Sequence, residues 1–172
     1  EGVRRVLAAM GPAVLGVSAA QISALINTQL AAMLGDGRIS WITYADRLME
    51  EIALVAAATG RRRAVHLHWG GGTPSILGET LIRRVMDRLA TAFDLSALRE
   101  HAIELDPRRV TPALAHALAD IGVDRASLGV QDFDPRVQKA IGRVQPFEVV
   151  EAAVAALRNA GIGRINIDLI YG

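Results

Sequence analysis

The sequence predicts an α/β fold with about four parallel strands covered by helices, preceded by a long apolar helix. Three observations predict it. From residue 52 onward, strand-like and helix-like stretches alternate along the chain. The predicted strands are mainly apolar, as strands of a covered parallel sheet are. Residues 6–35 contain no charged side chain. The sheet could belong to a barrel or to a doubly wound fold, and four strands alone are too few to close a barrel.

Composition limits the size and chemistry of the protein. The 172 residues are enough for one ordinary domain, and 19 basic against 18 acidic residues leave a net charge of +1. Such a balance does not favour nucleic acid as a partner. The chain contains no cysteine, which excludes disulfides and thiolate-bound zinc or iron–sulfur clusters within it. Charge is sparse in the first 60 residues, and a composition shift of this kind is a candidate boundary. We expect two parts, 1–51 and 52–172, on the resemblances given below.

The uncharged run at residues 6–35 is long enough to cross a membrane, since about 20 apolar residues suffice. Trp41 and Tyr44 follow it, and aromatic side chains prefer the lipid–water boundary. The alternative is a buried amphipathic helix of a soluble protein. The residues alone leave both interpretations open.

The first elements of the second part are separated by glycines and arginines. An Ala-rich helix over 52–59 should end at Gly60, because glycine suits the left-handed position after a helix. A strand over 64–69, a helix over 74–93 and a short strand over 102–105 follow.

Capping residues and apolar spacing predict the remaining elements. Thr111 and Pro112 form an N-cap and first-turn pair that opens a helix ending near residue 121. The later elements are a strand over 126–130, helices over 135–141 and 147–160, and a strand over 165–170.

Polar residues collect where the predicted strands end, and ligands bind at that edge of parallel α/β sheets. Two carboxylates, Glu104 and Asp168, lie within apolar strands, where burial without partners is costly. The alternative is that they cap loops or form ion pairs with Arg108, Arg143 or Arg164. The full set is Gly70 to Thr73, Glu104, Asp106, Gln131, Asp132 and Asp168.

The glycine run 70–72 would let a backbone approach a ligand closely, because no Cβ intervenes. It lacks the pattern and the lysine of a phosphate-binding loop. His66 and His68 share one face of a strand. We interpret them as hydrogen-bonded histidines and predict no metal site, because a third ligand is not evident.

Four motifs resemble one enzyme family, and they occur in order at the spacing of that family. They are HWGGGTP (68–74), ELDPR (104–108), SLGVQDF (127–133) and NIDLIYG (166–172). Together they resemble the oxygen-independent coproporphyrinogen III oxidase (dehydrogenase) family, the HemN-type radical S-adenosylmethionine (SAM) enzymes. The resemblance covers about 52–172.

The resemblance implies a partial (βα) barrel that binds two SAM molecules. It places Gly71 and Glu104 at the cluster-bound SAM. It places Gly72, Thr73, Gln131, Arg143 and Asp168 around the second. The family converts two propionates of coproporphyrinogen III, a small-molecule porphyrinogen substrate, to vinyl groups in haem synthesis. Its 4Fe-4S cluster is held by three cysteines that are missing here, so we expect the chain to be inactive alone.

A second resemblance lies upstream. Residues 12–28 and 40–50 resemble the MurJ/MviN family of lipid II flippases, whose inward arginines are thought to meet a lipid-linked diphosphate. Arg47 falls on one of those positions, as a lipid head-group contact. The chain therefore resembles a fusion of two fragments joined near 49–51.

The two resemblances imply different locations. Residues 52–172 would be cytoplasmic, and residues 6–35 would make membrane contact. The alternatives to a radical SAM fragment are a membrane-inserted flippase fragment with a passenger domain, and a non-enzymatic domain that binds a nucleotide-like ligand.

Overall fold

The computed structural model describes residues 38–171. The chain divides into two compact units, 1–37 and 38–172, and the second is described below. The apolar helix expected within 6–35 lies outside the described residues. None of the helices between residues 38 and 171 combines the length and the apolar character that a membrane crossing requires.

Helix α2 spans Arg38–Thr59, which is much longer than the predicted 52–59. No glycine or proline interrupts these 22 residues, so the helix can continue through the charged stretch 46–51. It ends as predicted at Gly60, which has a φ of 72° and whose N–H binds the Ala56 carbonyl at 2.9 Å. The expected boundary between residues 51 and 52 therefore falls inside a helix and stays a prediction about the origin of the sequence.

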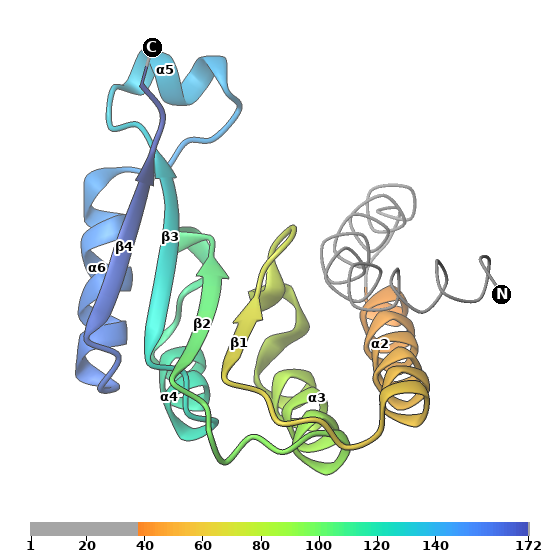
Figure 1. Cartoon of the computed structure of the whole chain (residues 1–172). Helices are drawn as coiled ribbons and strands as arrows, with labels where there is room; N and C mark the ends of the chain where they lie inside the picture. The colour runs from red at the N-terminus through yellow and green to blue at the C-terminus, as the bar shows by residue number, and fades with distance from the viewer. Residues whose placement is uncertain (1–37, 172) are drawn as a thin grey trace, which may run out of the picture. The chain divides into compact units, whose positions relative to one another are not determined.

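Four parallel strands form one sheet in the order β1-β2-β3-β4 (Figure 1). Their bounds are His66–Trp69, Glu100–Leu105, Arg125–Gln131 and Arg164–Leu169. Sequential order with parallel pairing requires a crossover between each pair of strands, and helices supply it. The predicted α/β class and the parallel sheet are confirmed.

The crossover helices begin in different ways, and only some of them have a side-chain cap. The predicted helix 74–93 is divided into the 3-10 turn η1, Pro74–Leu77, and helix α3, Gly78–Ala92, because Gly78 has a φ of 69°. Thr111 caps helix α4, its Oγ1 accepting the Leu114 N–H at 3.1 Å. The remaining elements are η2 (Pro107–Arg109), α4 (Pro112–Asp120), α5 (Pro135–Ala140) and α6 (Phe147–Asn159).

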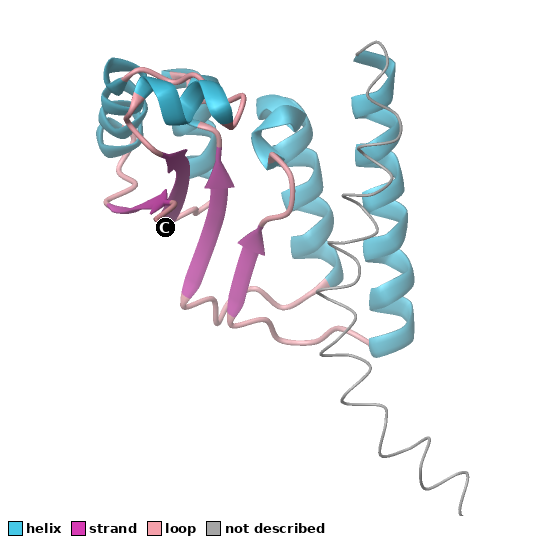
Figure 2. Cartoon of the chain, turned by 90° about the horizontal axis from the view of Figure 1, so that it is seen from above, coloured by secondary structure: helices cyan, strands magenta, loops and turns pink. Residues whose placement is uncertain are grey.

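The hydrophobic core lies between the sheet and helices α3, α4 and α6 (Figure 2). Burial alternates along β3: Ala126, Leu128 and Val130 are buried, whereas their neighbours Ser127 and Gln131 are partly exposed. One face of the strand therefore packs on helices, and the other carries polar groups. Those polar groups are available to a ligand.

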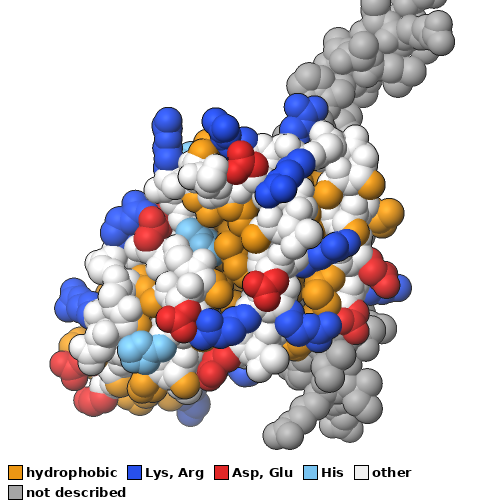
Figure 3. All heavy atoms as spheres, turned by 90° about the horizontal axis from the view of Figure 1, so that it is seen from below, with side chains coloured by type: hydrophobic (Ala, Val, Ile, Leu, Met, Phe, Trp, Pro, Cys, Tyr) orange, Lys and Arg blue, Asp and Glu red, His pale blue; other side chains and the backbone are white. Residues whose placement is uncertain are grey.

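Ion pairs connect the amino ends of the strands. Arg125 binds Glu100 at 3.1 Å, and Arg164 binds Asp124 at 2.6 Å. The side seen in Figure 3 accordingly mixes basic and acidic side chains with hydrophobic ones. Exposed pairs of this kind stabilise a fold by about 0–1 kcal/mol each. They help to order the strand starts, at the edge opposite the polar strand ends.

Candidate functional site

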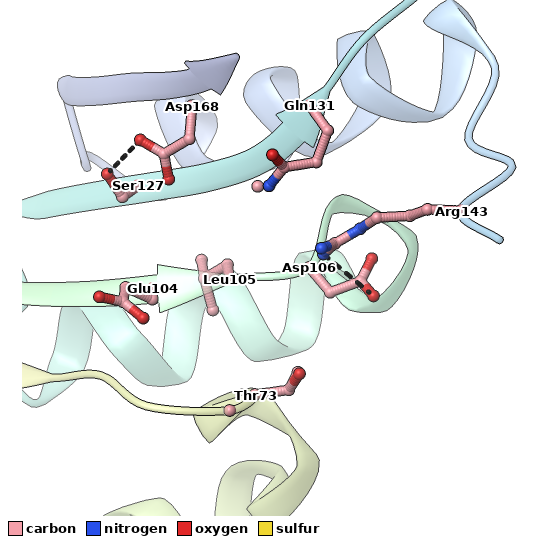
Figure 4. Close-up of a pocket in the computed structure, with 10 residues that line it drawn as sticks. Thr73, Glu104, Leu105, Asp106, Ser127, Gln131, Arg143 and Asp168 are labelled. Atoms are coloured by element: carbon pink, nitrogen blue, oxygen red, sulfur yellow. Dashed lines mark hydrogen bonds and ion pairs between the residues drawn. The ribbon is translucent and has the colours of Figure 1, made fainter. Parts of the chain in front are cut away.

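A pocket opens at the carboxyl edge of the sheet, and every described strand contributes to it directly or through the loop that follows (Figure 4). The glycine loop after β1 forms one side, and the ends of β2, β3 and β4 form the others. An arginine from the loop between α5 and α6 reaches in. The lining residues are Gly72, Thr73, Glu104, Leu105, Asp106, Ser127, Gly129, Gln131, Arg143 and Asp168.

Glu104 fastens the glycine loop to β2. Its Oε2 accepts the N–H of Gly71 at 3.2 Å, and its Oε1 lies 3.1 Å from Nε2 of His68. A Cβ at Gly70 would come within 2.7 Å of His68 Nε2 and 3.0 Å of Glu104 Oε1. Gly71 and Gly72 have φ values of 80° and 75°, which favour glycine. The glycine run therefore has a steric basis in this loop.

A buried pair of rings lies directly before the loop. Trp69 Nε1–H donates to Nε2 of His101 at 2.7 Å, and the ring centroids are 6.3 Å apart. Burial lowers the pKa of His101, although the charge of Asp124 opposes the shift. A neutral imidazole can accept the indole hydrogen, so the pair holds the end of β1 against β2.

Asp106 is a buried anion shared by two arginines. It is 6 % exposed, Arg108 Nη2 lies 2.6 Å from its Oδ2, and Arg143 Nη2 lies 3.7 Å from the same atom. Burial alone would raise the pKa of Asp106, but the hydrogen bonds and charges of the arginines lower it below its ordinary value. Asp106 therefore stays ionised and keeps Arg143 at the pocket.

A β-bulge turns Gln131 toward the same pocket. The pairing register of β3 with β4 shifts between Gly129 and Gln131. Gln131 has a φ of 72°, the one positive value at a non-glycine position among residues 38–171. Bulges near sites commonly redirect a side chain in this way.

Arg143 pairs with Asp106, but its guanidinium is not fully hydrogen-bonded. Its Nε is buried without a hydrogen-bond partner within the described part of the chain. A Cβ at Gly129 would approach its Nη2 to 3.2 Å, so glycine there leaves space for the guanidinium. Across the pocket, Ser127 Oγ donates to Asp168 Oδ1 at 3.4 Å. The arginine and the carboxylate thus stand on different walls of one polar pocket.

The pocket unites six of the seven residues that the resemblance implies: Gly72, Thr73, Glu104, Gln131, Arg143 and Asp168. The seventh, Gly71, binds Glu104 beside them. Arg47 lies exposed on α2 and is not among the pocket-lining residues.

The predicted ion pairs of Glu104 and Asp168 with three arginines are wrong, because these arginines bind other carboxylates, whereas Glu104 does bind the glycine loop at the Gly71 N–H. Arg108 and Arg143 bind Asp106, and Arg164 binds Asp124 and Glu100. His68 contacts Glu104. Between residues 38 and 171, no group of three His, Asp or Glu side chains could hold a metal ion.

Comparison with known families explains why these residues converge. The family model of the radical SAM superfamily matches residues 34–172, which is most of the chain. The chain belongs to the radical SAM superfamily. The expected fold, a partial radical SAM barrel with four parallel strands, agrees with this assignment.

Several curated relatives of the chain are named as oxygen-independent coproporphyrinogen III oxidases. The oxygen-independent coproporphyrinogen III oxidase of Bradyrhizobium diazoefficiens is 50% identical over 130 residues, covering 75% of this chain and 29% of the relative. The Paracoccus denitrificans protein of that name is 43% identical over the same shares. The Helicobacter pylori protein is 41% identical over 141 residues, covering 81% of this chain and 30% of the relative.

A solved structure agrees with the sequence comparison. The coproporphyrinogen III oxidase HemN of Escherichia coli, described as a radical SAM enzyme, matches with a TM-score of 0.71 and 38% identity. The match covers 77% of this chain and 31% of that one. The chain thus spans about a third of the length of the proteins it matches.

The amino-terminal part matches another family. The model of the lipid II flippase MurJ matches residues 1–54, which overlap the radical SAM match by about twenty residues. Both resemblances seen in the sequence are therefore confirmed as family matches. Most of the flippase match lies outside the described residues.

The superfamily implies SAM and a 4Fe-4S cluster, and the residues present fit the first but not the second. The pocket offers the Arg143 guanidinium, an amide, a glycine loop and, beside the ion-paired Asp106, the carboxylates of Glu104 and Asp168, which suit a zwitterionic nucleoside. The 172 residues contain no cysteine to ligate a cluster.

Proposed function

We propose that the pocket is the SAM-binding rim of a coproporphyrinogen III dehydrogenase-like radical SAM enzyme. One observation carries the proposal: six of the implied SAM contacts line one pocket, although they come from segments up to about a hundred residues apart. The names of the relatives support the substrate class, a porphyrinogen whose propionates are oxidatively decarboxylated.

The pocket residues suit distinct parts of SAM. Arg143 supplies a planar cation for a carboxylate, and charge-assisted bonds of this kind are among the stronger ones. Glu104 and Asp168 accept hydrogen bonds from an ammonium or from ribose hydroxyls. Gln131 both donates and accepts, as an adenine edge requires. The glycine loop lets the backbone come close to the ligand.

SAM bound at a reduced cluster supplies a 5′-deoxyadenosyl radical in this superfamily. We propose that this chain alone binds SAM weakly and does not cleave it, because it has no thiolate to hold a cluster. Its own residues would orient the nucleoside and nothing more. The whole enzyme activity would need cluster ligands from elsewhere.

Equilibrium dialysis of the full chain with labelled SAM tests the binding. We expect weak saturable binding of SAM. Arg143→Gln should lower the affinity by about tenfold, because one charge-assisted contact is lost. Arg136→Gln is the matched control, because Arg136 is exposed and binds Asp134 away from the pocket. Equal affinity of the two variants, or stronger competition by ATP than by unlabelled SAM, would count against a SAM site.

Anaerobic reconstitution with iron and sulfide tests the second half of the proposal. We expect no visible absorbance from thiolate-bound iron and no 5′-deoxyadenosine after a strong reductant is added. Stoichiometric iron with deoxyadenosine formation would contradict it. His66→Gln and His68→Gln would then show whether histidines had become the ligands.

A second candidate rests on the flippase match at residues 1–54. In this alternative the apolar run 6–35 inserts in a membrane, Arg47 meets a lipid head group and residues 52–172 are a cytoplasmic passenger. Carbonate extraction of cell membranes separates the two, with a 52–172 chain as control. Full recovery of the whole chain in the supernatant would dismiss it.

The two family matches meet inside α2, and we propose that two coding sequences were joined near codons 49–51. Sequencing reads that span codons 45–55 from the source genome would test this. If no read contains the junction, the fusion is an artefact of sequence assembly and does not exist in the organism.

A further inference from the structure

Two buried glutamine side chains lie behind the pocket wall, and neither belongs to the residues that line it. Gln138 on α5 is 4 % exposed, and Gln145 in the following loop is 0 % exposed. Polar groups at this depth are costly unless they are hydrogen-bonded. Their bonds therefore indicate what they do.

The two glutamines hydrogen-bond to each other, and Arg143 lies between them in the sequence. Gln138 Oε1 accepts the Gln145 N–H at 3.0 Å, and Gln138 Nε2 donates to the Gln145 carbonyl at 3.0 Å. The Gln138 carbonyl accepts the Arg143 N–H at 2.8 Å. Residues 143 and 145 are thus both fixed to one residue of α5.

Gln145 also holds the bulge of β3. Its Nε2 donates to the Gly129 carbonyl at 3.1 Å and to the carbonyl of Val130. The amide orientation is dictated by these contacts, because a flipped amide would place an oxygen against two carbonyl oxygens. Gln138 Nε2 continues the contact by donating to the Asp132 carbonyl at 2.9 Å. The pair therefore spans both sides of Gln131.

We infer that Gln138 and Gln145 form a buried amide clasp that positions Arg143 and Gln131 in the pocket. The inference rests on the proposed function for the identity of the ligand, SAM. The hydrogen bonds of the two glutamines do not depend on that identity. The clasp joins the two segments that carry these side chains, the β3 bulge and the α5–α6 loop. Neither glutamine touches the ligand in this proposal, so both are positioning residues.

Gln145→Met keeps the length of the side chain and removes both donors. We expect faster hydrogen exchange in peptides covering 129–133 and 141–147, with unchanged exchange in β2 and α4. We also expect SAM affinity to fall by about tenfold, because the arginine loses its fixed place. Val144→Ala is the control, since Val144 is an adjacent exposed side chain at 61 %. It should leave both readouts unchanged.

A double-variant cycle separates positioning from a general structural role. In an Arg143→Gln background, Gln145→Met should change SAM affinity by less than about twofold, because the arginine it positions is already absent. Additive losses, exchange that rises equally throughout the core, or wild-type values in both readouts would each overturn the clasp. If Gln145→Met does not fold, Gln138→Leu carries the same test, because it releases the loop without exposing the Gly129 carbonyl.

Failure of the SAM proposal can be told apart from failure of the clasp. A wild-type chain that binds no SAM rejects the proposed function. The exchange measurement then decides the clasp alone: local exchange limited to the two segments supports it, and unchanged or general exchange rejects it.

Discussion

The indole N–H of Trp69 donates to His101 across 2.7 Å and so joins the last residue of β1 to the second residue of β2. The contact lies immediately before the glycine loop, and both side chains are buried. It needs a neutral imidazole, which burial favours by lowering the pKa of His101. The geometry of the loop is therefore coupled to the protonation state of a buried histidine.

The stability of the fold should fall as the solution is acidified through the histidine range. Below the ordinary pKa of 6.5, the unfolded chain binds a proton that the folded chain, with its lowered pKa, does not. The free energy of unfolding should therefore decrease from about pH 7 to about pH 5. Urea denaturation at several pH values measures it. His101→Gln, which keeps a hydrogen-bond acceptor, should reduce the change in the free energy of unfolding with pH. His116→Gln, at an exposed position, should not.

Gly70→Ala should disturb the glycine loop. The new Cβ would lie 2.7 Å from His68 Nε2 and 3.0 Å from Glu104 Oε1, so the His68 side chain must move and its contact with Glu104 must change. We expect about tenfold weaker SAM binding with a destabilisation of about 1–3 kcal/mol. Gly163→Ala is the control, because a methyl group at that position would meet no other atom within 4 Å. Equal behaviour of the two variants in dialysis and thermal melts would show that the loop tolerates a side chain.

Asp106→Asn removes the buried anion between Arg108 and Arg143. We expect a loss of about 1–3 kcal/mol in the free energy of unfolding, because charge-assisted bonds are lost in a buried place. The loss should shrink under acid conditions: the pKa of Asp106 is below its ordinary 3.8, so its stabilisation disappears as pH falls through that lowered value. Asp134→Asn is the control, since asparagine still caps α5 and only an exposed pair is lost. A loss as small as that of the control would mean that Asp106 contributes little.

Strand β4 should promote self-association. Within the described residues it pairs on one side with β3, and its Ile167 and Leu169 are 45 % and 54 % exposed. An apolar edge strand can pair with another chain. We expect sedimentation velocity to show association that grows with concentration and that Ile167→Lys reduces. Leu54→Lys adds the same charge on α2 and should have no effect. A concentration-independent monomer would contradict the prediction.

Much of the fold could be predicted because local signals agreed with tertiary packing. Thr111 marked the start of α4, and Gly60 marked the end of α2. The start of α2 was missed, since its charged middle has no strong apolar period and packing decides its length. The break at Gly78 was also missed, because a positive φ at a glycine leaves no mark in the hydrophobic pattern.

Only the pocket residues at the carboxyl ends of the parallel strands could be predicted from the sequence. Glu104 and Asp168 follow from the rule that parallel strands end at one edge. The supporting residues could not be found in this way. His101, Gln138 and Gln145 have no motif or period of their own, and their roles depend on which segments the fold brings beside them. Supporting residues of this kind could be predicted only if the burial of polar residues beside the site were known.

Helix α2 runs unbroken across residue 51, so the number of residues in the helix fixes the rotation of its first half relative to its second half. Each residue of an α-helix turns the chain by about 100°, so one residue added or removed near that position would rotate the described part of α2 before it by that angle relative to the part after it. Asp46 would swing away from Arg84, which it meets at 3.5 Å, and buried Ala45 would leave its packing surface. An insertion of about seven residues would nearly restore the angle but would move Asp46 by about 10 Å along the helix axis, so the contact with Arg84 would still be lost. The number of residues between Asp46 and Gly60 therefore fixes which side chains from the first half of α2 reach α3.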